Sequence, residues 1–370
     1  MRRVATVFTR RALAAIGVLL GMITLTFVIY WSVPSEPAAF LYPNTQHLSN
    51  DMVRRGNHLL GTDRPKLTQY VDYLGQIARG DLGTSWTGAT VNPDQKLVAP
   101  AIGPRLFAAT RLTGSILLGG TALALLLAIP LGAFAGRFQG TFLDRTISLV
   151  TLIGICTHPM VVGLLLRTVF GNRLHWLPPI GYCTFSSAGQ GSSVVVPDPG
   201  FDANIPCSGP VAWAEHLILP WVTFALLFLA LYTRLIRASV IDAMHEDYVR
   251  TARAKGAGES RVLRRHALPN AALPVLTLIG IEVGTALGIA VYIESAFGMP
   301  GLGRLSVSVL VGTVGLDLPL ILATVTILTA IVLAGNLIVD TLYAVLDPRV
   351  GTTRPRRRHR QTKASRPVST

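Results

Sequence analysis

The chain has 370 residues, of which 50% are hydrophobic and only 14% are charged. An average soluble domain carries roughly 25% charged residues, so this composition excludes an ordinary water-soluble domain and favours a protein surrounded by lipid. The net charge of +14 comes from 33 Lys and Arg against 19 Asp and Glu. In a soluble protein such an excess would suggest nucleic acid, so the placement of the basic residues decides what it means.

Six apolar segments are candidates for membrane-spanning helices, because a helix needs about 20 mostly apolar residues to cross the hydrocarbon core. Glu282 is the single charged residue within them, and His158-Pro159 predicts a kink in the third. A backbone in lipid must satisfy its own hydrogen bonds, so the sequence predicts an all-α integral membrane protein with six helices. The segments are Ala12–Val33, Leu112–Ala135, Thr146–Leu166, Leu217–Thr233, Ala271–Ile293 and Leu318–Val339.

The basic residues indicate the orientation of the chain, because Lys and Arg near helix ends mark the cytoplasmic side. Arg2, Arg3, Arg10 and Arg11 precede the first segment, so we expect the N-terminus inside, and six crossings return the C-terminus to the same side. The first segment is too long for the core of a typical signal peptide and is expected to remain as a span. The sequence thus predicts a multi-pass protein of the cell membrane, inner or plasma, with both termini cytoplasmic.

This topology divides the chain into a cytoplasmic N-terminus with the first helix (1–33), an extracytoplasmic segment (34–111), a transmembrane core (112–347) and a basic tail (348–370). In the extracytoplasmic segment, Asp63 is expected to cap a helix whose first turn holds Pro65. The apolar residues of that helix share one face, which we expect to lie against the membrane helices. They are Leu67, Tyr70, Val71, Leu74 and Ile77.

The tail gathers its basic residues between Arg354 and Arg366 and has no aromatic residue there on which a base could stack. It predicts a disordered segment that favours the anionic headgroups of membrane lipid, and no nucleic-acid binding.

Two cysteines lie in the second extracytoplasmic loop, residues 171–216, which is rich in Gly, Ser and Pro and is expected to be irregular. An oxidising exterior permits a disulfide between Cys183 and Cys207. The sequence alone leaves a disulfide and two free thiols equally open.

The segment Glu246–Pro274, EDYVRTARAKGAGESRVLRRHALPNAALP, is highly charged although it lies between two apolar spans. Gly256 and Gly258 divide it into a helix–glycine–helix hairpin. One interpretation is a solvated loop of basic residues that merely set the topology. The other is a docking surface for a cytoplasmic partner, because so polar a hairpin has nothing to bury against in lipid.

This hairpin resembles the EAA loop (here 246–274) of permeases from binding-protein-dependent ABC importers, specifically those of the dipeptide and oligopeptide family. Thr251, Ala252 and Arg253 stand at the E-A-A position, Gly256 and Ala257 follow, and Leu268 and Pro269 close the motif. Further similarities continue in order along nearly the whole chain: Pro34-Ser35-Glu36-Pro37, Arg79-Gly80-Asp81-Leu82-Gly83, Trp176-Leu177-Pro178, Glu294 with Pro300-Gly301-Leu302-Gly303, and Asn336 with Asp340. The chain departs from the family at Ser35, which replaces a glycine, and at the charged Glu282.

The resemblance implies a type I ABC importer permease that forms half of a translocation pore for di- or oligopeptides or related small solutes. It also implies partners: a second homologous permease subunit, one or two ABC ATPase subunits that dock on the EAA loop, and an extracytoplasmic substrate-binding protein. The chain itself has no G-x-x-x-x-G-K-[ST] phosphate loop and no nucleophile–base constellation. We therefore expect no enzyme, no cofactor and no metal.

Polar residues in or beside the spans are candidates for the solute pathway or for a subunit interface, because a charge in lipid is costly. They are Glu282, Glu294, Asn336 and Asp340. Asn336 and Asp340, one helical turn apart, also suit a contact between helices. Glu282 leaves an alternative open, an ion-coupled secondary transporter that uses it as a proton site, and a membrane scaffold that recruits a cytoplasmic protein is a third possibility.

Overall fold

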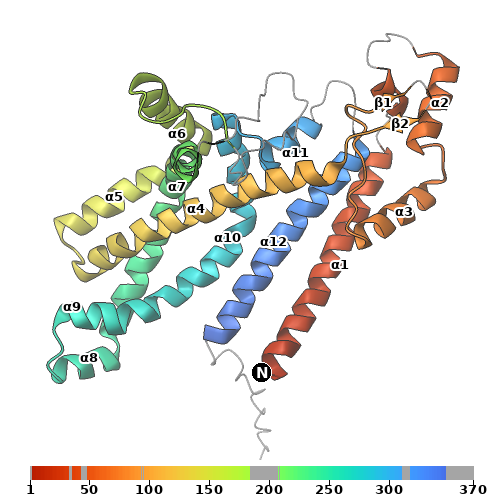
Figure 1. The fold of residues 1–370 in the computed structure, drawn as a ribbon. Helices are drawn as coiled ribbons and strands as arrows, with labels where there is room; N and C mark the ends of the chain where they lie inside the picture. Colours follow the sequence, from red (N-terminus) through yellow and green to blue (C-terminus); the bar gives the residue numbers. More distant parts are fainter. Residues whose placement is uncertain are drawn as a thin grey trace, which may run out of the picture.

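In a computed structural model, the described residues of the chain are 2–32, 36–42, 48–92, 94, 96–183, 207, 209–310 and 317–346. Within them the fold is built almost entirely from helices (Figure 1), which confirms the predicted all-α class. Pro34, Ser35 and the basic tail lie outside the described residues. The long helices are α1 Arg2–Ser32, α4 Ile102–Arg137, α7 Pro210–His245, α10 Leu268–Phe297 and α12 Leu318–Leu346.

The shorter elements connect or cover the long helices. Before α4 lie η1 Pro37–Leu41, α2 Asn50–Leu60, α3 Lys66–Ala78 and an antiparallel pair of strands, β1 Thr90–Val91 and β2 Leu97–Val98. Between α4 and α7 lie α5 Phe142–Cys156, α6 Pro159–Leu166 and η2 Arg167–Arg173. Between α7 and α10 lie α8 Asp247–Ala254, α9 Glu259–Val262 and η3 Leu263–Ala267, and α11 Leu302–Leu310 precedes α12.

Five helices among the described residues are long and apolar enough to cross a membrane, and they contain five of the six predicted spans. The third predicted span, 146–166, is instead divided into α5 and α6, of 15 and 8 residues. Thr157 and His158 between them have extended backbones, and at His158 the following Pro159 disfavours the helical conformation. The expected kink is therefore a complete break, and neither half is long enough to span a bilayer alone.

α4 and α7 pack along each other and form the centre of the bundle. α4 begins at Ile102, so the predicted boundary at Arg111 falls inside this helix. Small residues let the two backbones approach: a Cβ added at Gly132 of α4 would lie only 2.8 Å from the side chain of Ile236 on α7. Ile236 is buried in the main hydrophobic core, which α10 completes.

The segment before α4 is folded against α1 and α12 through a second core. The ring of Trp86 lies 6.5 Å from that of Tyr30 on α1 and 6.0 Å from that of Phe40. Ser85 donates a hydrogen bond of 2.6 Å to the buried carboxylate of Asp317, which precedes α12. This segment is therefore fixed to the helix bundle by aromatic packing and by buried polar contacts.

The helix predicted after Asp63 is present as α3, but its start differs from the prediction. Pro65 occupies the N-cap position, and Asp63 shares a hydrogen bond of 2.9 Å with His58 instead of capping the helix. The predicted apolar face is only partly covered: Tyr70, Leu74 and Ile77 pack against the second core, whereas Leu67 and Val71 are exposed.

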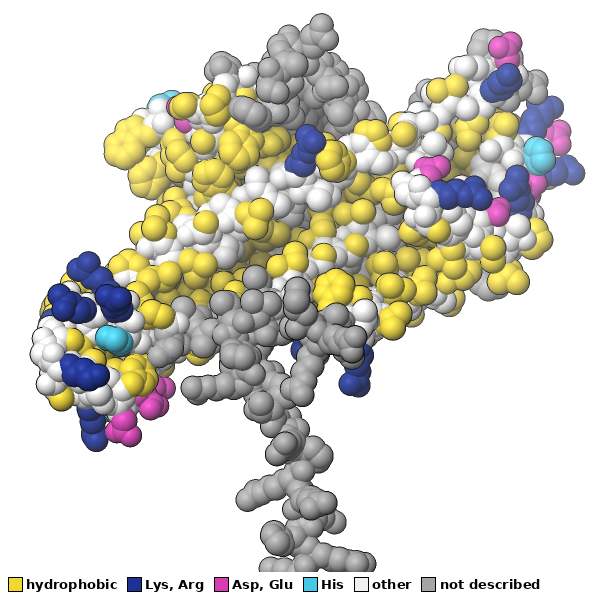
Figure 2. Space-filling view, turned by 60° about the horizontal axis from the view of Figure 1, so that its bottom comes forward, with side chains coloured by type: hydrophobic (Ala, Val, Ile, Leu, Met, Phe, Trp, Pro, Cys, Tyr) yellow, Lys and Arg dark blue, Asp and Glu magenta, His cyan; other side chains and the backbone are white. Residues whose placement is uncertain are grey.

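Charged side chains gather at two ends of the molecule, separated by a broad apolar band (Figure 2). One end holds α8 and α9, and the N-terminal end of α1 points the same way (Figure 1). The other holds α2, α3 and the two strands. This distribution is the one expected of a protein whose long helices cross a bilayer, because charges are costly in the hydrocarbon region.

Candidate functional site

The polar hairpin, Glu246–Pro274, projects from one end of the helix bundle (Figure 1). Between α8 and α9 the chain turns at Gly256, whose φ of +83° lies in the left-handed region that favours glycine. No atom lies within 4 Å of a Cβ built at Gly256. It is therefore the backbone conformation, and not the surrounding atoms, that requires glycine at this position.

One side of the polar hairpin is buried against the end of α7. Val249, Val262 and Ala267 have no exposed surface, and both α8 and η3 contact α7. The residues that resemble an EAA motif lie mostly on the other side: Thr251, Arg253, Gly256 and Pro269 are exposed, and Ala252, Ala257 and Leu268 are half-buried. The segment is thus a folded element with an accessible polar face, and not an irregular solvated loop.

An ion pair closes the turn of the polar hairpin. Arg253 of α8 donates two hydrogen bonds to the carboxylate of Glu259 at the start of α9, at 2.8 and 3.2 Å. These bonds lower the pKa of Glu259 below its usual value. Both side chains remain 40% or more exposed, so we expect the pair to order the turn locally and to add little global stability.

The polar hairpin continues into α10 without interruption. Val262, Ala267 and Leu268 all have helical backbone angles, and η3 between α9 and α10 is a wide turn of the π type. The helix does not stop before Pro269, which lies within this continuous run and donates no backbone hydrogen bond there. The hairpin and α10 therefore form one continuous helical segment.

An ion pair with a buried carboxylate, which the sequence did not predict, lies near the end of α7 that leads into this hairpin. Arg237 of α7 donates hydrogen bonds of 2.5 and 2.7 Å to the two carboxylate oxygens of Asp144, near the start of α5. Asp144 also accepts a bond of 3.0 Å from the backbone N–H of Gly140, and its side chain is only 5% exposed. In the sequence, Asp144 is a single acidic residue in a basic loop. Its partner lies 93 residues away along the chain, so the sequence alone does not indicate the pair.

Glu294 lies at the opposite end of α10 and is fully buried. It accepts hydrogen bonds from the hydroxyl of Thr113 on α4, at 2.6 Å, and from the backbone N–H of Arg304 on α11, at 2.9 Å. This burial contradicts the expectation that Glu294 faces a solute pathway or a partner surface. The carboxylate instead joins three helices of this chain and caps the start of α11.

The other polar candidates have different surroundings. Asp340 of α12 forms an ion pair with Arg11 of α1, so it joins two neighbouring helices, as its position suggested. Asn336 is half-buried on the same helix. Glu282 is half-buried in α10 and interacts electrostatically with the phenol of Tyr232 on α7. Of these candidates, Glu282 and Asn336 remain predictions for a pathway or an interface.

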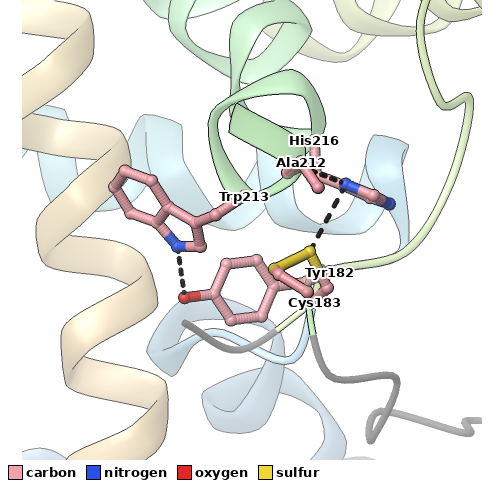
Figure 3. The surroundings of a disulfide bond; sticks show 6 residues. Tyr182, Cys183, Ala212, Trp213 and His216 are labelled. Carbon is pink, nitrogen blue, oxygen red and sulfur yellow. Dashed lines mark hydrogen bonds between the residues drawn. A yellow bond between two sulfur atoms is a disulfide. The ribbon is translucent and has the colours of Figure 1, made fainter. Parts of the chain in front are cut away.

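Cys183 and Cys207 are joined by a disulfide bond (Figure 3), with their Cα atoms 5.0 Å apart. The bond lies against the first turns of α7. There the ring of His216 lies 3.6 Å from the sulfur of Cys183, and Trp213 donates a hydrogen bond of 3.1 Å to the hydroxyl of Tyr182. The disulfide therefore fixes the two ends of the intervening loop to one helix.

No group of three or more His, Cys, Asp or Glu side chains that could hold a metal ion occurs in the described part of the chain. Among the described residues, the polar hairpin is the candidate site with the clearest geometry.

These features define a multi-pass helical membrane protein with a structured polar hairpin between two of its long helices. The chain belongs to the family described as the binding-protein-dependent transport system inner membrane component, whose model matches residues 128–352. A second model, for the N-terminal part of such membrane components, matches residues 4–93. The chain is therefore a membrane permease subunit and not itself an enzyme.

Similar proteins extend over almost the whole chain. A protein of Brucella suis biovar 1 named as a peptide permease is 34% identical over 93% of this chain and 98% of its own length. The oligopeptide transport system permease protein of Bacillus subtilis is 32% identical over 94% and 99%. The dipeptide transport system permease protein of Alkalihalophilus pseudofirmus is 31% identical over 92% and 98%.

Proposed function

We propose that this chain forms half of the translocation pathway of an ATP-driven importer and that its solutes are peptides. The peptide assignment is supported by relatives that are named as peptide, dipeptide or oligopeptide permeases and that align over nearly their full length. Membership of a binding-protein-dependent transport family supports work with an ATPase and a substrate-binding protein. The chain carries no phosphate loop of its own, so ATP hydrolysis belongs to other subunits.

The observation that carries this proposal is the polar hairpin. Its buried side ties it to α7, and its helical backbone runs on into α10. Its exposed side presents the EAA-like residues to a partner. A rigid element that is exposed on one side and continuous with membrane helices on the other is suited to receive an ATPase subunit and to pass its movement on.

The partners we propose are a second homologous permease subunit, one or two ATPase subunits bound at the polar hairpin, and a substrate-binding protein at the opposite end. Arg10 and Arg11 precede the apolar part of α1, at the same end of the molecule as the hairpin. Basic residues in short flanking segments favour the cytoplasmic side, so we place the hairpin and both termini in the cytoplasm.

The test is co-purification of the chain from its native membrane in mild detergent, followed by ATP-driven peptide uptake in proteoliposomes. We expect a second permease, a phosphate-loop ATPase and a binding protein to accompany the chain. If it purifies alone, and Glu282→Gln abolishes proton-driven uptake, the half-buried Glu282 supports the ion-coupled alternative instead.

Two glycines of the polar hairpin provide matched variants for the docking assignment. Neither Gly256 nor Gly258 has an atom within 4 Å of an added Cβ, but φ is +83° at Gly256 and −66° at Gly258. Gly256→Ala is expected to distort the turn and weaken ATPase binding, whereas Gly258→Ala is expected to leave it intact. Equal ATPase recovery with both variants would argue against docking at this turn. Gly256→Asp is expected to stay in the membrane but to uncouple uptake from ATP hydrolysis.

A further inference from the structure

We propose that the Asp144–Arg237 ion pair is a positioning element that makes α5 move together with the end of α7 that carries the polar hairpin. The proposal rests on the function proposed above, because it describes how movement of the hairpin reaches helices that the hairpin does not itself continue into.

The Asp144 carboxylate accepts hydrogen bonds from two neighbouring segments, α7 and the α4–α5 turn. Arg237 binds it with a fork of two hydrogen bonds at 2.5 and 2.7 Å, which fixes direction as well as distance. The N–H of Gly140 in the α4–α5 turn adds a third bond of 3.0 Å. Thr141 caps the first turn of α5 by accepting from the N–H of Asp144 at 3.4 Å. The turn, α5 and α7 are thus locked at one carboxylate.

The pair lies near the end of α7 that leads into the polar hairpin, and the end of α4 packs beside it. Arg237 lies about two helical turns before the end of α7, after which the hairpin begins. Gly136 of α4 packs against the same part of α7, since an added Cβ would lie 3.1 Å from the carbonyl oxygen of Arg237. Arg137, the last residue of α4, interacts electrostatically with Glu259 of the hairpin. The end of α4 is therefore held against α7 and lies within electrostatic range of the hairpin.

A purely stabilising role explains this arrangement less well. Burying the Asp144 carboxylate costs solvation free energy, and well-packed apolar side chains commonly stabilise a protein as much or more. A forked ion pair supplies instead a fixed geometry between two elements. The carboxylate of Asp144 is only 5% exposed, so solvent screens its attraction to Arg237 weakly. We therefore expect the pair to keep its geometry when the hairpin is displaced.

The test uses the full complex in proteoliposomes and measures peptide transported per ATP hydrolysed. Asp144→Asn keeps the side-chain size but removes the charge, and Arg237→Lys keeps the charge but removes the fork. Both are expected to assemble with the ATPase and hydrolyse ATP while the transport ratio falls at least about fivefold, the lower end of typical coupling between sites. Asp144→Glu, which preserves the charge, should retain more of the ratio than Asp144→Asn.

Asp242→Asn is the matched control, because Asp242 is an exposed carboxylate on the same helix. It should leave the ratio unchanged. If Asp144→Asn and Arg237→Lys leave the ratio unchanged while Gly256→Ala lowers it, the proposed positioning role of the ion pair is wrong. The importer assignment would still stand. If neither Asp144→Asn nor Arg237→Lys accumulates in the membrane, the positioning role is also wrong, because the ion pair would then be needed for folding. Absence of any ATP-driven uptake by the unaltered complex would instead overturn the proposed function itself.

Discussion

The hydroxyl of Thr113 donates a hydrogen bond of 2.6 Å to the carboxylate of Glu294 and accepts one of 2.9 Å from the backbone N–H of Leu302. Thr113 therefore holds both the carboxylate and the start of α11, the helix that Glu294 caps. Gly301 lies directly beside them, and a Cβ added there would come within 2.1 Å of the Glu294 carboxyl group. The glycine of the Pro300-Gly301-Leu302-Gly303 sequence is thus required by the space that Glu294 occupies.

We expect Gly301→Ala to destabilise the protein by roughly 2 kcal/mol or more, because the added methyl group must displace a buried, hydrogen-bonded carboxylate. Gly288→Ala in α10 is the control, since no atom lies within 4 Å of a Cβ at that position. Thermal unfolding of the two variants in the same detergent measures the difference. Equal melting temperatures would show that the carboxylate is not held where the structure places it.

Asp317→Ala should loosen the segment before α4 from the helix bundle. The carboxylate accepts bonds from Ser85 at 2.6 Å and from the N–H of Thr87 at 2.8 Å, and it caps α12 through Leu320 at 3.2 Å. Its loss removes a cap and leaves buried donors without an acceptor, so we expect a cost of roughly 2–4 kcal/mol. Limited proteolysis should cut this segment faster in the variant, whereas Asp94→Ala, at an exposed site of the same segment, should be cut at the unaltered rate.

The Cys183–Cys207 bond predicts a specific thiol count. The chain has three cysteines, so a maleimide should label one thiol per denatured chain before reduction and three after it. The bond closes a loop with a sequence separation of 24, for which a chain-entropy model gives about 3 kcal/mol of stabilisation. Cys183→Ser with Cys207→Ser should therefore lower the melting temperature, whereas Cys156→Ser removes a thiol outside the bridge and tests only the count. Three labelled thiols without reductant would contradict the pairing.

The Arg253–Glu259 ion pair predicts a pH dependence at the turn of the polar hairpin. Hydrogen bonds from Arg253 lower the pKa of Glu259 in the folded state, so the pair's contribution is present above the ordinary Glu pKa of about 4.3. That contribution is lost as the pH falls through the lowered, folded-state pKa. Hydrogen exchange at the amides around Gly256 should be slower in the unaltered chain than in Glu259→Gln at neutral pH. The difference should vanish in acid, and a difference that persisted there would contradict the ion pair as its cause.

The sequence predicted those features that depend on neighbours along the chain. Long apolar runs located five spans, and the charge of the polar hairpin together with Gly256 located the turn between α8 and α9. The extent of α4 and α7 was underestimated, because each continues past its apolar part as a helix of 36 residues. Hydropathy marks where a helix meets lipid and does not mark where the helix ends.

The contacts between distant residues could not be predicted in the same way. Glu294 and Thr113 are 181 residues apart, and Ser85 and Asp317 are 232 apart. Each residue alone is an ordinary polar residue, and only the packing of α4 against α10, and of the segment before α4 against the start of α12, brings the partners together. The break at His158-Pro159 was underestimated for a related reason, since a proline in a span permits a bend or a break and the surrounding packing decides between them.

The unbroken backbone from α9 through η3 to the end of α10 makes a single rod of roughly 60 Å, at about 1.5 Å per residue. One tip of the rod lies in the polar hairpin, and the other carries Glu294 and, through it, the start of α11. A small tilt at the first tip must therefore swing the second unless the rod bends at Pro269 or Pro274, its two prolines. The stiffness of these two proline-containing turns sets how much of a movement at one side of the membrane reaches the other.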